Sequence, residues 1–255
     1  MCLINFQLNS HSRYKLVMAA NRDEEYSRPT EAAHFWEEHP DLLAGRDLRG
    51  MGTWLGITRD GRISALTNVR NTKELLSTHG KSRGHLVRGY LTGDAHPKEY
   101  LKKIAEEGGD YAGFNLLAGT PDELYYVNNY RNEVTRVEDG IHGLSNHHLD
   151  TPWPKVVKGN ERLKFVVDDD DVDIEALFKL LRDDETAAVD SLPDTGLSKE
   201  IEKNLSPLFI NMDKYGTRCS TVILIDRSDN VTFVERTYVK GEATGDVRYD
   251  FALES

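Results

Sequence analysis

The chain has 255 residues, of which 38% are apolar and 29% charged, so its composition excludes a disordered tail or a fibrous repeat. Its formal charge of -11 argues against binding to nucleic acid or to an anionic membrane surface, because both need clustered basic residues. No apolar stretch approaches the roughly 20 residues that span a bilayer. The start of the chain also lacks the pattern of a signal peptide, so we expect a cytoplasmic protein without integral membrane association.

The first third of the chain is predicted to form strands. Apolar residues alternate from Cys2 to Leu8, which predicts a strand with one strongly buried face. The apolar run over 15–20 predicts a second strand covered on both faces, and the polar residues 9–14 between them predict a hairpin. Further strands are expected over 42–45, 53–58 and 63–69.

Helices are expected in the middle of the sequence, with strands before, between and after them. Apolar stripes predict helices over 83–91, 96–107, 154–166 and 174–181, and a short one near 198–205. Apolar segments predict strands over 114–118, 124–127, 133–137 and 141–144, and a closing hairpin of 218–225 with 231–238. Neither repeats nor a linker occur, so we expect one domain over residues 1–255, in which stacked sheets pack with helices.

Cys2 is the first candidate for chemistry, because removal of the initiator methionine before a small residue would make it N-terminal. It would then carry a thiol and a free α-amine, which titrates near about 7.7–8.0 and can accept the thiol proton without a histidine. The alternative is that Cys2 is a small buried hydrophobic residue of the first strand. The other cysteine is Cys219, so a disulfide framework and a cysteine-rich zinc module are excluded.

The predicted hairpin places Cys2 opposite Arg22 or Asp23, at the abruptly charged end of the second strand. Arg22 would favour the thiolate and so lower the pKa of the Cys2 thiol, and Asp23 could hold the α-ammonium group. The alternative is a salt-bridged strand end in solvent, with Arg22 paired to Glu24 or Glu25.

Ordered motifs along the whole chain carry a family resemblance. Met-Cys-Leu-Ile begins the chain, Asn-Arg-Asp-Glu occupies 21–24, and Arg28-Pro29 follows. Further matching segments lie at 44–47, 52–56, 65–70, 143–146 and 215–218. Together they resemble the NRDE family, also called the transport and Golgi organisation 2 family. The resemblance implies the α+β class and a four-layer α-β-β-α sandwich of the N-terminal nucleophile hydrolase type, distantly similar to penicillin V acylases and bile-salt hydrolases.

The resemblance also implies roles for individual residues. Cys2 would attack a carbonyl carbon, Arg22 would stabilise it, and Asp23 would contact its amine. The other polar residues implied at the site are Asn68 and Asn146, as donors to the oxyanion, and Arg218. Asparagine at a strand end, as at Asn68, is also an ordinary turn former.

The remaining candidates are residues for substrate binding, the second cysteine and possible metal or cofactor sites. Trp54 and Asn21 are assigned to substrate binding, although a core tryptophan between sheets is the alternative for Trp54. Cys219 is predicted to be structural, because strand alternation turns it away from a site that Arg218 faces. The adjacent histidines at 147–148 would point to opposite faces of a strand, which disfavours a shared metal. Phosphate-binding glycine loops do not occur in the sequence, which gives no support to nucleotide-dependent chemistry. The nine histidines lack the H-E-x-x-H spacing of a zinc site, so we expect no metal and no cofactor.

These features predict a hydrolase of a linear or cyclic non-peptide C–N amide, acting through an acyl thioester on Cys2. Its partner is a small-molecule substrate, and a homo-oligomer is left open. The alternative is a non-catalytic carrier that uses the same cleft for a hydrophobic ligand such as acyl-CoA or haem. An exposed and reactive Cys2 would discriminate between them, because a carrier does not need it.

Overall fold

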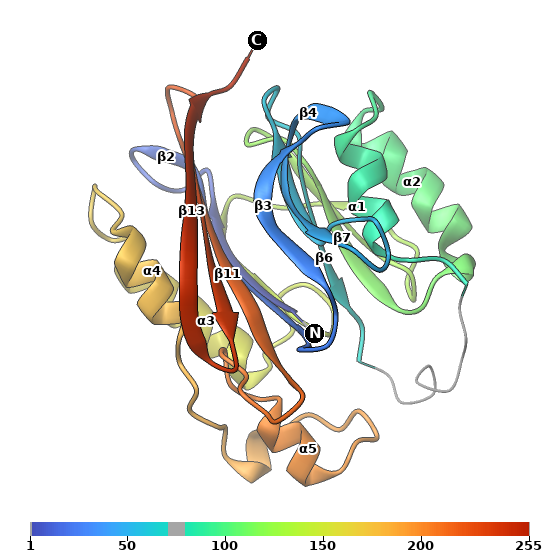
Figure 1. The fold of residues 1–255 in the computed structure, drawn as a ribbon, viewed down its shortest axis with the longest axis vertical. Coiled ribbons are helices and arrows are strands. Elements are labelled where there is room, and N and C mark those ends of the chain that lie inside the picture. The colour runs from blue at the N-terminus through green and yellow to red at the C-terminus, as the bar shows by residue number, and fades with distance from the viewer. Residues whose placement is uncertain (1, 71–79, 255) are drawn as a thin grey trace.

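Two antiparallel sheets face each other in the structure, a computed structural model that describes residues 2–70 and 80–254 (Figure 1). The strand orders are β10-β1-β2-β11-β12-β13 in the first sheet and β3-β4-β5-β6-β7-β8-β9 in the second. The first sheet contains β1 (Cys2–Leu8), β2 (Tyr14–Glu25), β10 (Gly140–Leu144), β11 (Tyr215–Asp226), β12 (Asn230–Val239) and β13 (Glu242–Ala252). The second contains β3 (Thr30–Trp36), β4 (His39–Asp47), β5 (Leu55–Thr58), β6 (Ile63–Asn68), β7 (Phe114–Gly119), β8 (Leu124–Asn128) and β9 (Thr135–Arg136).

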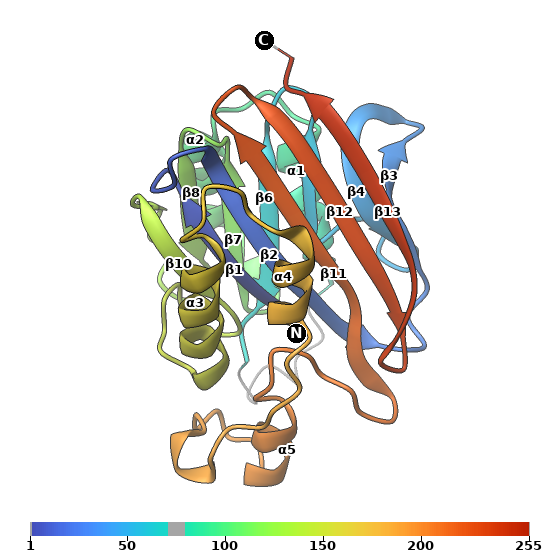
Figure 2. The ribbon, with the colours of Figure 1, turned by 90° about the vertical axis from the view of Figure 1, so that its left-hand side faces the viewer.

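Helices cover the outer face of each sheet. The second sheet packs against α1 (Gly84–Leu91) and α2 (Pro97–Glu107), and the first against α3 (Pro154–Val166) and α4 (Ile174–Leu181), as Figure 2 shows for the latter pair. Within residues 2–70 and 80–254, the other helical elements are α5 (Lys199–Asn204) and the 3-10 turns Gly108–Asp110 and Val189–Ser191. The four layers are therefore α-β-β-α, as predicted. Within the described ranges, no helix is long and apolar enough to cross a membrane.

The first strand, β1, contributes to two hydrophobic cores. Ile4 and Phe6 point between the sheets, whereas Leu3 points to the helices. The predicted strand and its buried face are confirmed, and the structure adds that the other face is buried too, since all seven residues are buried. Because α3 covers the second face, its polar side chains need partners there, and Asn5 Nδ2 donates to Asn160 Oδ1 at 2.8 Å.

The helices lie close to their predicted positions, and those over 154–166 and 174–181 match to the residue. Asp173 caps α4, accepting a hydrogen bond from the backbone N–H of Glu175. The sequence does not predict β3 and β13, which lie at the edges of the two sheets. Most side chains of β13 are exposed, so the strand can carry charged residues, and these hide the apolar pattern by which a strand is predicted. The second strand also runs on to Glu25, because β11 pairs with it along its charged end.

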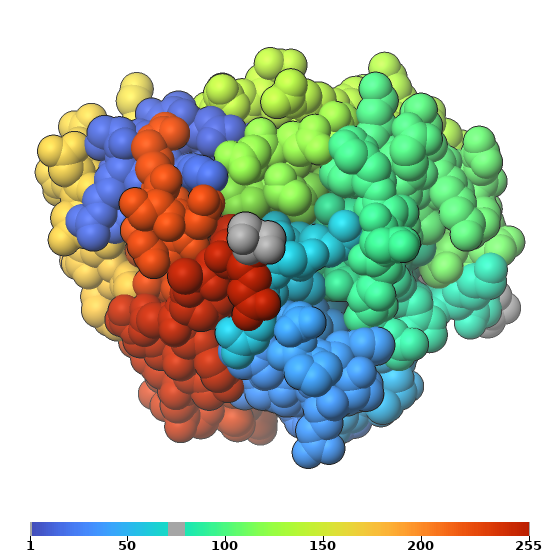
Figure 3. Space-filling model, turned by 90° about the horizontal axis from the view of Figure 1, so that it is seen from above, coloured from blue at the N-terminus to red at the C-terminus, as the bar shows by residue number. Residues whose placement is uncertain are grey.

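Figure 3 shows the end of the molecule at which the segment after β13 lies beside the turn between β5 and β6. After β13, Leu253 N donates to Asp229 O and Glu254 N donates to Arg59 O, at 2.8 Å each. Arg59 lies in the turn between β5 and β6, so the second bond joins the two sheets. The candidate site lies at the opposite end, where β1 begins and β6 ends.

Candidate active site

A cavity of about 620 Å³ lies between the sheets at the end where β1 begins. Cys2, Cys219, Asn68 and Trp54 contribute to its lining. Among the residues that the structure describes, seven basic ones also line it against five acidic ones, although the chain as a whole carries a formal charge of -11. The basic residues are Arg22, Arg28, Arg46, Arg49, Lys81, Arg83 and Arg218. The cavity is therefore a basic region of an acidic protein.

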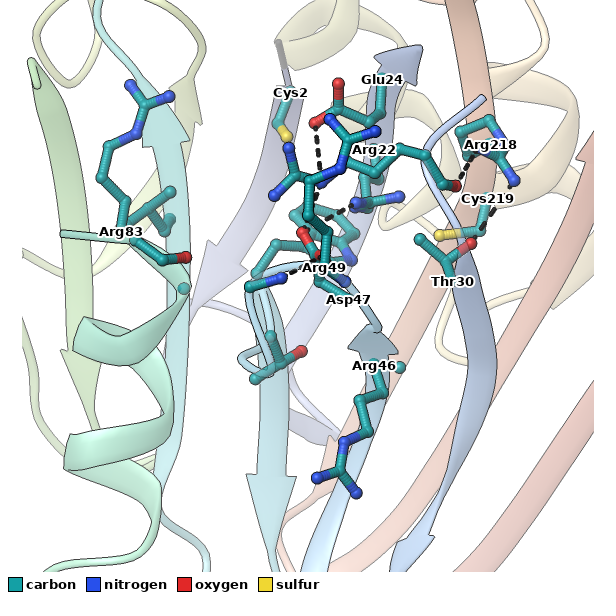
Figure 4. A pocket seen from close by; sticks show the side chains of 18 of the residues that line it. Cys2, Arg22, Glu24, Thr30, Arg46, Asp47, Arg49, Arg83, Arg218 and Cys219 are labelled. Carbon is teal, nitrogen blue, oxygen red and sulfur yellow. Dashed lines mark hydrogen bonds and ion pairs between the residues drawn. The ribbon is translucent and has the colours of Figure 1, made fainter. Parts of the chain in front are cut away.

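Cys2, Arg22 and Cys219 form a row across three neighbouring strands (Figure 4). Cys2 of β1 is opposite Arg22 of β2, which confirms the predicted pairing, and Arg22 is opposite Cys219 of β11. Each residue is less than one tenth exposed, and each lines the cavity. Because β2 lies between the strands of Cys2 and Cys219, the Cα atoms of the two cysteines are about 10 Å apart. This distance is too long for a disulfide. Both thiols therefore face the cavity as separate groups.

The guanidinium of Arg22 is only loosely engaged by protein groups. Across the described ranges it makes no hydrogen bond, and 3.7 Å separates its Nη2 from Asp47 Oδ2. Neither Glu24 nor Glu25 forms an ion pair with it there, so the alternative pairing of Arg22 with one of these two residues is wrong. A nearly buried cation with free donors is suited to bind a negatively charged group in the cavity.

Asp47 was not singled out by the sequence analysis, although it lies in one of the matching segments. Its oxygens accept hydrogen bonds from Arg28 Nε at 2.6 Å and from the backbone N–H groups of Arg49 and Gly50 at 2.9 Å each. Burial raises the pKa of Asp47, but these hydrogen bonds outweigh it and leave the pKa below its usual range. Asp47 thus stays ionised and fixes the loop that forms one wall of the cavity.

Asp23 is a buried carboxyl group at the end of the cavity. It is 2% exposed, and its Oδ1 accepts from Thr217 Oγ1 at 2.7 Å. The Tyr215 hydroxyl donates to its backbone oxygen at 2.8 Å. Burial raises the pKa of Asp23, and positive charges nearby, including Lys155, act in the opposite direction. The predicted removal of Met1 concerns a residue outside the described ranges, so the contact of Asp23 with a Cys2 amine stays a prediction.

Burial raises the pKa of the Cys2 thiol, against the lowering that the sequence predicts. Arg22 does lower this pKa, as expected, but Asp23 raises it and the loss of solvent is the largest effect. Removal of Met1 would place the α-ammonium charge on Cys2 itself. That charge would favour the thiolate, so a lowered pKa of Cys2 stays a prediction for the processed chain.

Asn68 and Asn146 lie together but differ in their access to the cavity. Asn68 lines it, and its side-chain amide makes no hydrogen bond within the described part of the chain. Asn146 is fully buried and is not part of the lining. Its Nδ2 donates to the backbone oxygen of Asn68 at 2.9 Å, and its Oδ1 accepts from Ser145 Oγ at 3.1 Å. The Asn146 amide therefore holds the end of β6 outside the cavity lining, and the oxyanion roles implied for Asn68 and Asn146 stay predictions.

Arg218 lines the cavity, yet its guanidinium braces the turn between β2 and β3. Its Nη1 donates to the backbone oxygens of Glu25, Tyr26 and Arg28, at 2.9, 3.3 and 2.9 Å. These acceptors are neutral, so the positive charge of Arg218 adds to the basic character of the cavity. Figure 4 places Arg218 and Arg83 on opposite sides of it.

The two residues assigned to substrate binding have different positions. Trp54 is 8% exposed and lines the cavity, where it also joins the core between the sheets. Asn21 is fully buried on the helix side of the first sheet, so its assignment to substrate binding is wrong. Its Nδ2 donates to the backbone oxygens of Leu181 and Leu208, at 2.9 and 2.8 Å. Asn21 therefore ties the sheet to two segments outside it.

Cys219 faces the cavity, against the prediction that it turns away. The register of β11 shifts between Thr217 and Cys219, and this irregularity breaks the alternation on which the prediction rests. Burial raises the pKa of its thiol, and the thiol also shares a hydrogen bond with Glu235. Glu235, another lining residue that the sequence analysis missed, accepts from the backbone N–H of Ala33 at 2.8 Å.

The adjacent histidines do not lie on opposite faces of a strand. His147 and His148 follow β10 in a turn, and their ring centroids are 4.5 Å apart. Within residues 2–70 and 80–254, no group of three or more His, Cys, Asp or Glu side chains is placed to hold a metal ion.

The α-β-β-α layers are those of the N-terminal nucleophile hydrolase fold. The structure is similar to a Caenorhabditis elegans ortholog of N-acylethanolamine-hydrolyzing acid amidase, with a TM-score of 0.50, 11% sequence identity, and coverage of 88% of this chain and 92% of that chain. It is also similar to conjugated bile acid hydrolase from Clostridium perfringens, with a TM-score of 0.53, 9% identity, and coverage of 99% and 92%. At these identities the likeness shows the fold.

The chain belongs to the Transport and Golgi organisation 2 family, whose sequence profile matches residues 1–240. It is 35% identical to the human Transport and Golgi organization protein 2 homolog over 282 residues, covering all of both chains. It is 27% identical to the Drosophila melanogaster protein over 270 residues, covering 93% of this chain and 92% of that one. The resemblance predicted from the motifs is confirmed.

Proposed function

We propose that this protein hydrolyses a non-peptide C–N amide bond through an acyl thioester on an N-terminal Cys2. The observation that carries the proposal is the placement of Cys2 in the cavity wall, directly opposite Arg22 and one residue from the register of Asp23. The fold supports it, since the similar structures include an acid amidase and a bile acid hydrolase.

The reaction begins once removal of Met1 has freed the α-amine of Cys2. The amine takes the thiol proton, and the thiolate attacks the amide carbon. The tetrahedral oxyanion accepts a hydrogen bond from the Asn68 amide. One such donor stabilises the transition state by about 3 kcal/mol. The α-ammonium then gives its proton to the leaving nitrogen, which departs as an amine and leaves the acyl thioester. Water, deprotonated by the same amine, releases the acid and restores the thiol.

The charge of the cavity favours a substrate with an anionic group. Basic side chains outnumber acidic ones in its wall, and burial raises the pKa of Glu235, which further reduces the negative charge there. Arg22 has donors that the described protein groups do not fill. A carboxylate, phosphate or sulfonate near the scissile amide would satisfy them.

The test compares two preparations that differ by one residue. One begins at Cys2 after precise cleavage of a removable tag, and the other retains a single glycine before Cys2. Both preparations are incubated with a panel of simple acyl amides and acyl thioesters, and the panel includes substrates with and without a carboxylate group. Only the first should show turnover and a Cys2 acyl adduct by intact mass, because the extra glycine converts the base into an amide. Cys2→Ala should abolish the adduct, and Cys219→Ala should retain it.

Two outcomes contradict the proposal. Equal turnover by the preparation with the extra glycine would remove the Cys2 amine from the mechanism. No turnover by the processed protein, together with tight binding of an apolar ligand, would instead identify a carrier.

A further inference from the structure

A lysine lies on the buried face of α3, where the helix contacts β1. Lys155, Gly159 and Leu163 are spaced four residues apart, share one side of the helix and are all buried. The contact is close, because a Cβ added at Gly159 would lie 2.4 Å from Asn5 Oδ1 in β1. Lys155 is one helical turn from Gly159, at the N-terminal end of the helix.

The environment of Lys155 is unfavourable to a lysine in three ways. The residue is 2% exposed, whereas lysine is almost never fully buried without a partner. Its Nζ has no hydrogen-bond partner in the described ranges. It also lies in the first turn of α3, where the positive end of the helix dipole disfavours a cation. A fold selected for stability alone would place an apolar or acidic side chain here.

Titratable groups from four described segments act electrostatically on the Lys155 amine. Cys2 of β1, Asp23 of β2 and Glu202 of α5 favour its charged form, and Arg70, just after β6, disfavours it. Burial is the largest effect and lowers the pKa of Lys155 to about 8. Glu202 is already paired with Arg70. Of the groups that favour the charged form of Lys155, the other two, Cys2 and Asp23, belong to the candidate site.

We propose that Lys155 is a positioning residue of the Cys2 site, whose ammonium charge stabilises the Asp23 carboxylate and the Cys2 thiolate from the helix side of the sheet. Arg22 acts on the same thiolate from the cavity side. Tyr215 of β11 also lies beside Asp23, but burial raises the pKa of its hydroxyl, so it stays neutral. The inference rests on the proposed function, since it concerns the same thiol.

The test measures alkylation of Cys2 by iodoacetamide against pH in the processed full-length protein, with the adduct located by peptide mass. In Lys155→Met the midpoint should move to higher pH. A move of one unit lowers the thiolate fraction at neutral pH about tenfold. Lys155→Arg, which keeps the charge, should restore the wild-type midpoint. Lys164→Met removes an exposed lysine from the same helix and should leave the midpoint unchanged.

An unchanged midpoint in folded Lys155→Met would overturn the inference. Lys155→Gln provides a second neutral variant, and loss of the fold in both would overturn it as well, because the lysine would then be structural. Alkylation needs no amide substrate, so this test is separate from that of the proposed function. A shifted midpoint without amide turnover would support the role of Lys155 and contradict the proposed hydrolase. Amide turnover with an unshifted midpoint would support the hydrolase and contradict the role of Lys155.

Discussion

Replacing Lys155 by methionine should stabilise the folded protein at neutral pH, although it removes a charge from the candidate site. The pKa of Lys155 falls from 10.5 to about 8 on folding because the amine is buried. Each unit of difference corresponds to about 1.36 kcal/mol, so holding the charged amine in the folded protein costs about 3 kcal/mol. Methionine has a similar length and no charge, so Lys155→Met avoids this cost.

The pH dependence gives the prediction its sign. Between about pH 8 and 10.5 the unfolded chain binds the lysine proton and the folded chain releases it, so wild-type stability rises with pH across this window. Below pH 8 the full penalty applies. The advantage of Lys155→Met should therefore be greatest at pH 7 and disappear near pH 10.5.

Urea unfolding of both proteins at a series of pH values measures this difference. The two proteins carry the same other titrating groups, so subtraction leaves the titration of the lysine together with the shifts that it causes at Cys2 and Asp23. Lys164→Met serves as the exposed control. If Lys155→Met were less stable than wild type at pH 7, or more stable by a constant amount at every pH, the reasoning about burial would be refuted.

Two further variants test the structural corrections. Asn21→Ala should lower the free energy of unfolding by about 2–4 kcal/mol, because the buried oxygens of Leu181 and Leu208 lose their donor, while the Cys2 alkylation midpoint stays the same; a shifted midpoint with normal stability would return Asn21 to the site. Arg218→Gln should lower the midpoint of thermal unfolding and cost about 2 kcal/mol, because the β2–β3 turn loses a charged donor. Unchanged stability in that variant would show that the brace contributes nothing.

Sequence patterns were sufficient where the contacts are local. The pairing of Cys2 with Arg22 follows from the length of one hairpin, and apolar alternation fixes which side chains share a face. The same logic failed at Cys219, because a strand irregularity shifts the register by one residue and nothing in the local sequence marks it. For β13 a signal was present: Val247, Tyr249 and Phe251 alternate, although charged residues lie between them.

The site residues that escaped prediction depend on contacts across the fold. Asp47 lies on the second sheet and meets Arg22 only because the two sheets face each other. Lys155 has an ordinary position in an amphipathic helix sequence, and its burial becomes visible only when α3 docks on β1. Asn21 is part of the family motif, so its motif membership suggested a chemical role where the structure shows a packing role.

The positions of the buried titratable groups bear on the choice between a hydrolase and a carrier. At the end of the molecule where β1 begins, the carboxyl groups of Asp23 and Glu235 and the amine of Lys155 are all buried, and burial shifts the pKa of each toward the neutral form. A carrier for a hydrophobic ligand gains affinity from an apolar wall and has no use for such groups, which reduce stability. A site that must move a proton between a thiol and an amine needs titrating groups at close quarters. The concentration of these groups around Cys2 therefore favours the hydrolase.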